Sequence, residues 1–266
     1  MLMHLLNKRA KDYIKEIVYG LHPLTGEIHP LANKGWVVHR SMVSNEWGYC
    51  YFRIPKSAGS TIARSLAYYD PTRVYNPAED IRGKQIKKDA SYLLAAKTWS
   101  LAGLVRKYFL FTFVRNPYTR ILSAYLDKIA RLENTAFQST RDRVMTFSDT
   151  RRDLTFETFI RYLEKEGLYK NPHWIPQIGL LPVRVDQIHF IGKVENLDND
   201  LRQVMNRIYG EGVYQESLTR QHGRTDSTGK MMQYYDRKLL DRVYQLYQLD
   251  FASFSYPKDW SVNIPD

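Results

Sequence analysis

A short polar loop has the residue types needed to hold a phosphate. The segment 55–61 reads PKSAGST and supplies a lysine, small residues that allow close approach and three hydroxyl groups. Backbone N–H groups at the start of a helix bind anions, and Lys56 would add a positive charge. The order differs from the nucleoside-triphosphatase loop GxxxxGK(S/T), because Lys56 precedes Gly59. The alternative is a turn that caps a helix and leaves the lysine solvated.

An arginine that directly follows an apolar run gives a second chemical signal. Arg115 comes after 108–114 (YFLFTFV) and opens the segment RNPYTRILSAY. A guanidinium group offers a fork of donors that suits a phosphate. Ser123 lies eight residues later, near the same side of the expected helix. The two residues could bracket one phosphate; alternatively, Arg115 is an ion-pair partner and Ser123 a packing residue.

Strands that alternate with helices must position these loops. Aromatic or β-branched stretches predict the strands, and helical periodicity predicts the helices. The predicted strands are 49–54, 108–114 and 187–191, and the predicted helices are 61–69, 119–132, 197–208 and 231–249. This alternation predicts an α/β three-layer sandwich with a mostly parallel sheet. Ligands of such sheets bind beyond the carboxyl ends of the strands, so we expect both loops on one rim.

Composition limits the class of protein. With 266 residues, 44% of them hydrophobic, the chain can bury the core of one domain, and we expect a single domain over 1–266 with a loosely assigned segment at 1–45. A formal charge of +11 predicts attraction to anions such as nucleic acids, acidic glycans, phospholipids or nucleotides. The one cysteine, Cys50, excludes an intrachain disulfide and a cysteine-based zinc site.

The two loops together resemble the PAPS-dependent sulfotransferases, in particular their carbohydrate sulfotransferase branch (sulfotransferase family 2). In that family, an element like YFRIPKSAGST binds the 5′-phosphosulfate of 3′-phosphoadenosine-5′-phosphosulfate (PAPS), and a segment like FTFVRNPYTRILSAY binds its 3′-phosphate. Three further segments resemble the family: PHWIPQ (172–177), FIGKVENLDNDL (190–201) and YQLYQLDFASFSY (244–256). The resemblance covers about 49–256 and implies a P-loop-like strand–loop–helix fold.

The resemblance implies transfer of a sulfuryl group from PAPS to a carbohydrate hydroxyl, with release of adenosine 3′,5′-bisphosphate. Lys56 would stabilise charge on the bridging oxygen, and Arg115 and Ser123 would hold the 3′-phosphate. Other loop residues would surround the 5′-phosphate, and they are Ser57, Ala58, Gly59, Ser60 and Thr61. The polar segment 221–232 falls where the family closes over the nucleotide. Its Arg224 and Ser227 could reach phosphate, although a solvated surface loop is the alternative.

The acceptor hydroxyl needs a general base. His173 ranks first, because Trp174 and the flanking prolines indicate a stiff, partly buried loop; a histidine that only hydrogen-bonds within that loop is the alternative. Lys97 ranks second, since it aligns with a histidine of many family members and would need a lowered pKa. Glu195 ranks third, and an ion pair with Lys193 would explain it equally well.

Several expectations concern metals, partners and location. We predict no metal, because HExxH, a cysteine cluster and acidic metal-ligand repeats do not occur in the sequence. The expected partner is an acidic or neutral glycan acceptor, and no binding of nucleic acid is expected. The apolar N-terminal residues stop at Leu6, too short for a signal peptide or membrane span, so we expect a cytoplasmic protein. The alternative is a Golgi-type chain trimmed of its membrane anchor.

Two other functions share some of these features. A P-loop-type nucleotide kinase would show GK(S/T) at the end of the loop and an aspartate closing a later strand, whereas the strand 108–114 leads into Arg115. A basic nucleic-acid or nucleotide-binding module would suit the charge and the 20 tyrosines. However, the basic residues are spread along the chain, and no zinc-finger or RNP motif occurs.

Overall fold

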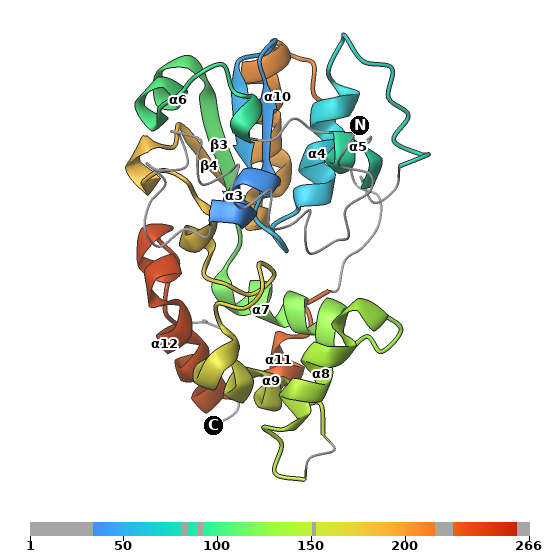
Figure 1. The fold of residues 1–266 in the computed structure, drawn as a ribbon, viewed down its shortest axis with the longest axis vertical. Coiled ribbons are helices and arrows are strands. Elements are labelled where there is room, and N and C mark those ends of the chain that lie inside the picture. Colours follow the sequence, from blue (N-terminus) through green and yellow to red (C-terminus); the bar gives the residue numbers. More distant parts are fainter. Residues whose placement is uncertain (1–33, 81–83, 90–92, 151–152, 216–225, 260–266) are drawn as a thin grey trace, which may run out of the picture.

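A four-stranded sheet forms the upper half of the molecule (Figure 1). The computed structural model describes residues 34–80, 84–89, 93–150, 153–215 and 226–259. The strands follow the order β1 (Ser41–Ser44), β2 (Tyr49–Phe52), β3 (Phe109–Val114) and β4 (Phe190–Lys193). β1 is antiparallel to β2, whereas the β2–β3 and β3–β4 pairs are parallel. The carboxyl ends of β2, β3 and β4 therefore meet at one edge, as the sequence predicts.

Helices cover both faces of this sheet, which gives the expected three layers. Side chains alternate along the strands, so Cys50 and Phe52 pack with one layer and Tyr49 and Tyr51 with the other. The first layer contains α3 (Lys34–Arg40) and α6 (Leu101–Lys107), together with the 3₁₀ turn Leu93–Ala95. The opposite layer contains α4 (Gly59–Tyr68), α5 (Lys84–Asp89) and α10 (Leu197–Tyr209). The fold is therefore α/β with a mostly parallel sheet.

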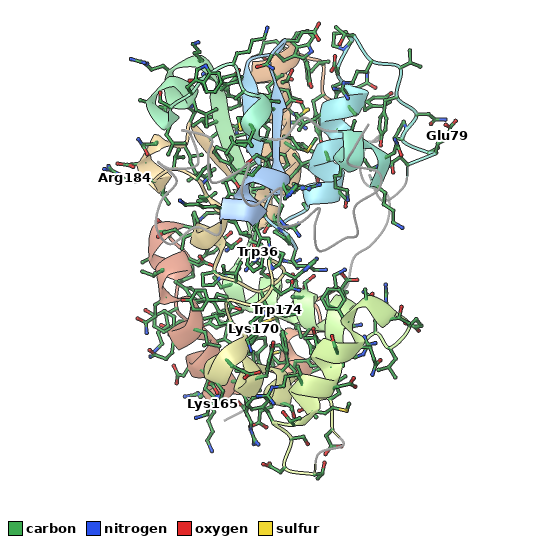
Figure 2. The ribbon with its side chains drawn as sticks, viewed as in Figure 1. Trp36, Glu79, Lys165, Lys170, Trp174 and Arg184 are labelled. Atoms are coloured by element: carbon green, nitrogen blue, oxygen red, sulfur yellow. The ribbon has the colours of Figure 1, made fainter. Side chains whose placement is uncertain are left out.

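A separate hydrophobic cluster fills the lower, helical half in Figure 1. Its helices are α7 (Pro117–Ala124), α8 (Gln138–Met145), α9 (Phe156–Tyr162), α11 (Met231–Tyr234) and α12 (Arg237–Ser253). α7 and α9 each continue into a π-helical turn, Tyr125–Ile129 and Leu163–Gly167. Short 3₁₀ turns connect the larger elements at Thr135–Phe137, Gln177–Leu180, Val185–Gln187 and Val194–Asn196. Trp36 and Trp174 are labelled where the two halves meet (Figure 2). The single-domain boundary stays a prediction.

Three predicted elements differ by three or more residues at one end from those in the structure. β4 starts at Phe190 instead of 187, because Val185–Gln187 forms a 3₁₀ turn and the His189 ring accepts the Leu110 N–H at 2.9 Å. The predicted helix 231–249 is two helices, since the Asp236 side chain caps α12 by accepting the Leu239 N–H at 2.7 Å. The helix predicted to end at residue 132 stops at Ile129, where the π-helical turn that follows α7 ends.

Candidate functional site

The loop after β2 has an unusual backbone. Lys56 and Ala58 adopt left-handed conformations, with φ of 69° and 55°. Each costs about 1–3 kcal/mol in a residue other than glycine, and such strain concentrates at functional sites. Ala58 is the N-cap of α4 and provides no side-chain cap for the helix's first turn. At Gly59 an added Cβ would lie 2.9 Å from Cγ of Arg53, so this position requires glycine unless the arginine moves. The loop therefore leads the backbone into a helix start without a side-chain cap, a position whose N–H groups can bind an anion.

The ammonium group of Lys56 is held by an ion pair. Its Nζ lies 3.0 Å from Oδ2 of Asp127, which also accepts Lys128 Nζ at 3.0 Å. Burial lowers the pKa of Lys56, and Asp127 opposes that effect. Burial would raise the pKa of Asp127, but Lys56 and Lys128 together lower it to about 2. Asp127 lies in the π-helical turn after α7, and such turns occur often at functional sites.

The loop after β3 is fixed by conventional contacts. The Asn116 side chain accepts the Tyr118 N–H at 3.0 Å, and Pro117 occupies the first turn of α7. Arg115 donates through Nε to Thr119 Oγ1 at 3.0 Å and through Nη2 to Ser227 Oγ at 2.6 Å. These contacts hold the guanidinium at the carboxyl end of β3.

The two loops touch, as the parallel strands predict. Arg115 Nη1 donates to the Lys56 carbonyl oxygen at 3.3 Å, so the second loop's guanidinium reaches the first loop. Ser123 is buried in α7, two turns beyond Arg115. Ser227 is also buried, and its contact with Arg115 brings the described part of the segment 221–232 to the site. Arg224 lies outside the described residues.

Gln177 joins the two loops from the segment 172–177. Its Oε1 accepts the Ser57 hydroxyl at 3.2 Å and the Arg115 N–H at 2.9 Å, while its Nε2 donates to the Arg115 carbonyl at 2.9 Å. The Gln177 N–H in turn donates to Asp250 Oδ2 at 2.7 Å. Gln177 and Ser57 are fully buried, so each of these groups would be costly to leave unpaired. The family resemblance includes this segment, but the role of Gln177 depends on its contacts with Arg115 and Ser57, which lie 62 and 120 positions away in the sequence.

A buried guanidinium ties the same segment to the first loop. Arg120, on α7, donates to the carbonyl oxygens of Pro55 at 3.1 Å and Ile175 at 2.8 Å. Burial lowers the pKa of Arg120, and Asp250 opposes this effect. Carbonyl groups and a nearby carboxylate thus replace water around the charge. The segment 172–177 is thereby packed against the loops after β2 and β3.

His173 lies near the Lys56 ion pair. Asn171 Oδ1 accepts the backbone N–H of His173 at 3.0 Å and lies 2.7 Å from its Nδ1. Because that oxygen is an acceptor, Nδ1 carries the proton in the neutral ring and Nε2 carries the lone pair. Burial is the main cause that lowers the pKa of His173 to about 3, and nearby cations, namely Lys128, Arg40 and Lys56, contribute. The histidine is therefore neutral at physiological pH.

Glu195 and Lys97 occupy different surroundings. Glu195 Oε1 accepts the Asn116 N–H at 2.8 Å, and its Oε2 accepts the Tyr256 hydroxyl at 2.9 Å, so the carboxylate supports the second loop. Lys97 is exposed, and its backbone N–H donates to the Tyr108 hydroxyl at 2.7 Å. Tyr108 precedes β3, whereas both loops follow the carboxyl ends of the strands. The structure thus does not bring Lys97 to the loops.

Sequence reasoning missed two charged residues of the site, Asp127 and Lys87. Lys87, on α5, donates from Nζ to Ser60 Oγ at 2.8 Å, in the first turn of α4. Lys56 and Asp127 are 71 positions apart, and Ser60 and Lys87 are 27 apart. Neither pair forms a local pattern, so only the packing of α5 and of the π-helical turn against the first loop reveals them.

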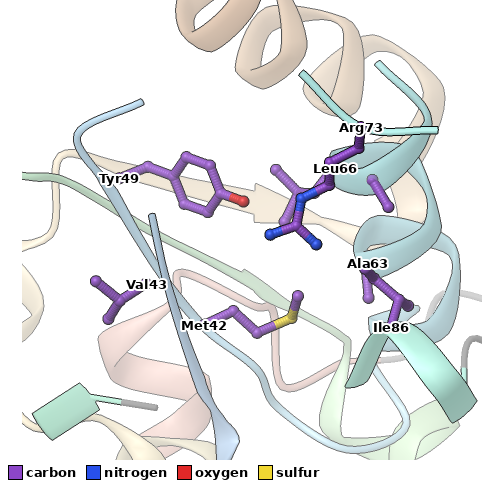
Figure 3. Close-up of a pocket in the computed structure, with 8 residues that line it drawn as sticks. Met42, Val43, Tyr49, Ala63, Leu66, Arg73 and Ile86 are labelled. Atoms are coloured by element: carbon purple, nitrogen blue, oxygen red, sulfur yellow. The ribbon is translucent and has the colours of Figure 1, made fainter. Parts of the chain in front are cut away.

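The small cavity in Figure 3 is too small to hold a nucleotide. It has a volume of about 20 Å³ and lies between β1, β2, α4 and α5, with lining residues that include Met42, Tyr49, Leu66, Arg73 and Ile86. About one water molecule would fill such a space. Within the described ranges, no group of three or more His, Cys, Asp or Glu side chains is arranged to hold a metal ion. None of the described helices is long and apolar enough to span a membrane.

Comparisons with known proteins agree on one family. A model of the sulfotransferase family matches residues 39–257. Carbohydrate sulfotransferase 14 of Danio rerio is 30% identical over 246 residues, which cover 86% of this chain and 65% of that protein. Carbohydrate sulfotransferase 14 of Mus musculus is 27% identical (86% and 63%), and carbohydrate sulfotransferase 11 of Rattus norvegicus is 25% identical (78% and 64%).

The chain spans slightly less than two thirds of the length of these relatives. No solved structure gave a significant match. Because the family model covers more than half of its residues, the chain belongs to the sulfotransferase family.

Proposed function

We propose that the protein is an enzyme that transfers a sulfuryl group from PAPS to a carbohydrate hydroxyl and releases adenosine 3′,5′-bisphosphate. The proposal rests on one observation: two loops meet at one edge of the sheet. There Arg115 donates to the Lys56 carbonyl, and Gln177 forms hydrogen bonds with both loops. Such a site offers charges for two separate phosphates. The family and the names of the relatives support the choice of donor and of a carbohydrate acceptor.

The residues divide into two phosphate subsites. The first turn of α4, with the backbone of Ala58 and Gly59 and the hydroxyls of Ser60 and Thr61, is our candidate for the 5′-phosphate. Arg115 and Ser123 are the candidates for the 3′-phosphate. Ser57 is buried and its hydroxyl donates to Gln177, so we assign it a positioning role. The charge at Arg115 would distinguish this donor from nucleotides that lack a 3′-phosphate.

The chemical step is a displacement at sulfur. The acceptor oxygen forms a bond to sulfur while the bond from sulfur to the bridging oxygen breaks, and the electron pair leaves on the 5′-phosphate. Lys56 would stabilise the negative charge that develops on that oxygen, once its ammonium moves from Asp127 to the donor. Positioning and electrostatics supply most of the acceleration in related phosphoryl transfers.

His173 is our first candidate for the base that takes the acceptor's proton. Its Nε2 carries the lone pair because Nδ1 donates to Asn171. A pKa of about 3 makes a weak base, but the cations that help to lower it would be neutralised by the donor's phosphates, so the pKa should rise on binding. If His173→Ala retained most of its turnover with unchanged nucleotide affinity, another group would have to be the base. Glu195 and Lys97 rank below it because of their surroundings.

The finer points of this function are also proposals. From the sequence we further propose an acidic glycan as the acceptor, independence of metals, no binding of nucleic acids and a cytoplasmic location. Chelator treatment tests metal independence, since loss of turnover that a divalent metal restores would contradict it. Binding of random DNA that falls steeply with salt would revive the nucleic-acid alternative.

Calorimetry with three ligands and three forms of the protein tests the donor site. We expect the wild-type protein to bind adenosine 3′,5′-bisphosphate about 100-fold more tightly than 5′-AMP, because hydrogen bonds to a charged group contribute about 1.5–3 kcal/mol each. Arg115→Ala should remove most of that preference, whereas Arg106→Ala, which removes an exposed guanidinium from α6, should keep it. Equal or tighter binding of ATP to the folded wild type would reject the proposal.

A further inference from the structure

A lysine from α5 reaches the start of α4 and is not part of either phosphate loop. Lys87 Nζ lies 2.8 Å from Ser60 Oγ. Because the ammonium can only donate, Ser60 accepts this bond and its own hydroxyl proton can be donated to a ligand. Ser60 is the second residue of α4, where backbone N–H groups also point out of the helix. Lysine, hydroxyl and N–H groups therefore converge on one place.

Hydrogen bonds and hydrophobic packing hold α5 in place. The Asp80 carboxylate accepts the backbone N–H groups of Lys84 at 2.6 Å, Gln85 at 3.3 Å and Ile86 at 3.0 Å. Ile86 is 7% exposed and packs in the hydrophobic cluster that contains α4 and α10. The helix start and the buried isoleucine together hold Lys87 against the first turn of α4.

Positive charge exceeds negative charge around Lys87. Burial is the main cause that lowers its pKa to about 8, and Arg53, Arg40 and Lys128 lower it as well, whereas Asp80 raises it. Arg53 follows β2, Arg40 ends α3, Lys128 lies in the π-helical turn and Asp80 precedes α5. Mutual repulsion of this kind is relieved when an anion binds among the cations. The surroundings of Lys87 thus favour a ligand with at least one negative group.

We propose that Lys87 is a binding residue for the 5′-phosphate group of the donor, together with Ser60 and the first turn of α4. This inference rests on the proposed function. It assigns the 5′ subsite a charge that belongs to α5, separate from Lys56, which remains available for the bridging oxygen. Arg115 serves the 3′ subsite, so the two phosphates are recognised by different cations.

A consequence of this assignment is a dependence of affinity on pH. Binding of a phosphate raises the pKa of Lys87 above its value of about 8 in the free protein. The contribution of Lys87 to affinity is therefore complete well below pH 8 and falls as pH rises through that value. Lys87→Arg keeps a charge at all these pH values and should lack this decline. Lys56 also has a lowered pKa, so the comparison with Lys87→Arg isolates the contribution of Lys87.

Three nucleotides separate the subsites in a binding experiment. Calorimetry at pH 7 with 5′-AMP, 3′-AMP and adenosine 3′,5′-bisphosphate should show that Lys87→Met weakens binding of the two 5′-phosphorylated ligands about tenfold. Binding of 3′-AMP should stay within about twofold of the wild type. Lys87→Met keeps the aliphatic stem, and circular dichroism verifies that the variant is folded. Lys84→Met, on the exposed side of α5, removes the same charge without the contact and should leave all three affinities unchanged.

The results distinguish a specific contact between Lys87 and the 5′-phosphate from a general electrostatic effect. Equal weakening of 3′-AMP and 5′-AMP, or the same effect in Lys84→Met, would show a general electrostatic effect and overturn the role of Lys87. Unchanged binding of all ligands to Lys87→Met would overturn it while the proposed function stands. If the wild-type protein binds no bisphosphate, both the proposed function and this inference fail.

Discussion

The loops after β2 and β3 lie side by side, yet they hold their charges in different ways. In the first loop, Lys56 has a left-handed backbone and its ammonium rests in an ion pair with Asp127. In the second loop, Arg115 precedes a conventionally capped helix and its guanidinium donates to Thr119, Ser227 and the Lys56 carbonyl. One cation has a charged partner that it can exchange, whereas the other is fixed by neutral groups.

This difference fits two separate tasks. A group that must follow developing charge benefits from an ionic partner that it can leave, because an incoming phosphate replaces the carboxylate with little net change in charge. A group that only recognises a phosphate benefits from rigidity, because preorganised donors lose little entropy on binding. The comparison therefore predicts that changes in the first loop affect turnover and changes in the second affect affinity.

The largest effect is expected at Lys56. Lys56→Ala should lower kcat about 1,000-fold, because a positive charge at the leaving oxygen is worth several kcal/mol in the transition state. Binding of adenosine 3′,5′-bisphosphate should weaken about tenfold or less. Steady-state kinetics with PAPS and calorimetry with the bisphosphate measure the two quantities.

A matched control for this change is Lys165→Ala. Lys165 is an exposed lysine at the lower end of the molecule (Figure 2), far from the sheet edge, and its loss should change neither quantity. If Lys56→Ala instead weakened nucleotide binding as strongly as turnover, the distinction between the two loops would be lost.

A second prediction concerns Gln177, which connects both loops. Gln177→Leu leaves the Ser57 hydroxyl and the N–H and C=O of Arg115 without their amide partner in a fully buried place. Each unpaired group costs about 1–3 kcal/mol, so we expect the free energy of unfolding to fall by about 3 kcal/mol. Urea denaturation measures this loss, and Gln203→Leu, at an exposed position on α10, should change stability by less than about 0.5 kcal/mol. A neutral Gln177→Leu would mean that the loops are held independently.

The sequence predicts the local parts of this site and misses the long-range ones. The loops are predictable because each follows a run of strand-forming residues, and Pro55, Gly59 and Pro117 mark where those strands end. β1 and α5 show no comparable pattern, since each is short and acquires its position from neighbours. Lys87 and Asp127 lie far along the chain from their partners. Lys97 matches a family position in sequence, but in the structure it is exposed and lies beside Tyr108.

The smallest effect is expected when only the charge of Asp127 is removed. Asp127→Asn keeps the shape of the side chain but takes away the carboxylate that raises the pKa of Lys56. The pKa of Lys56, already lowered by burial, should then fall further in the free enzyme, so the alkaline limb of the pH profile of kcat/KM moves to lower pH. At neutral pH we expect a loss of only a few-fold in kcat, because the incoming donor replaces Asp127 as the partner of Lys56. Asp127→Glu should restore the alkaline limb, whereas a purely structural role of Asp127 would lower kcat equally at all pH values.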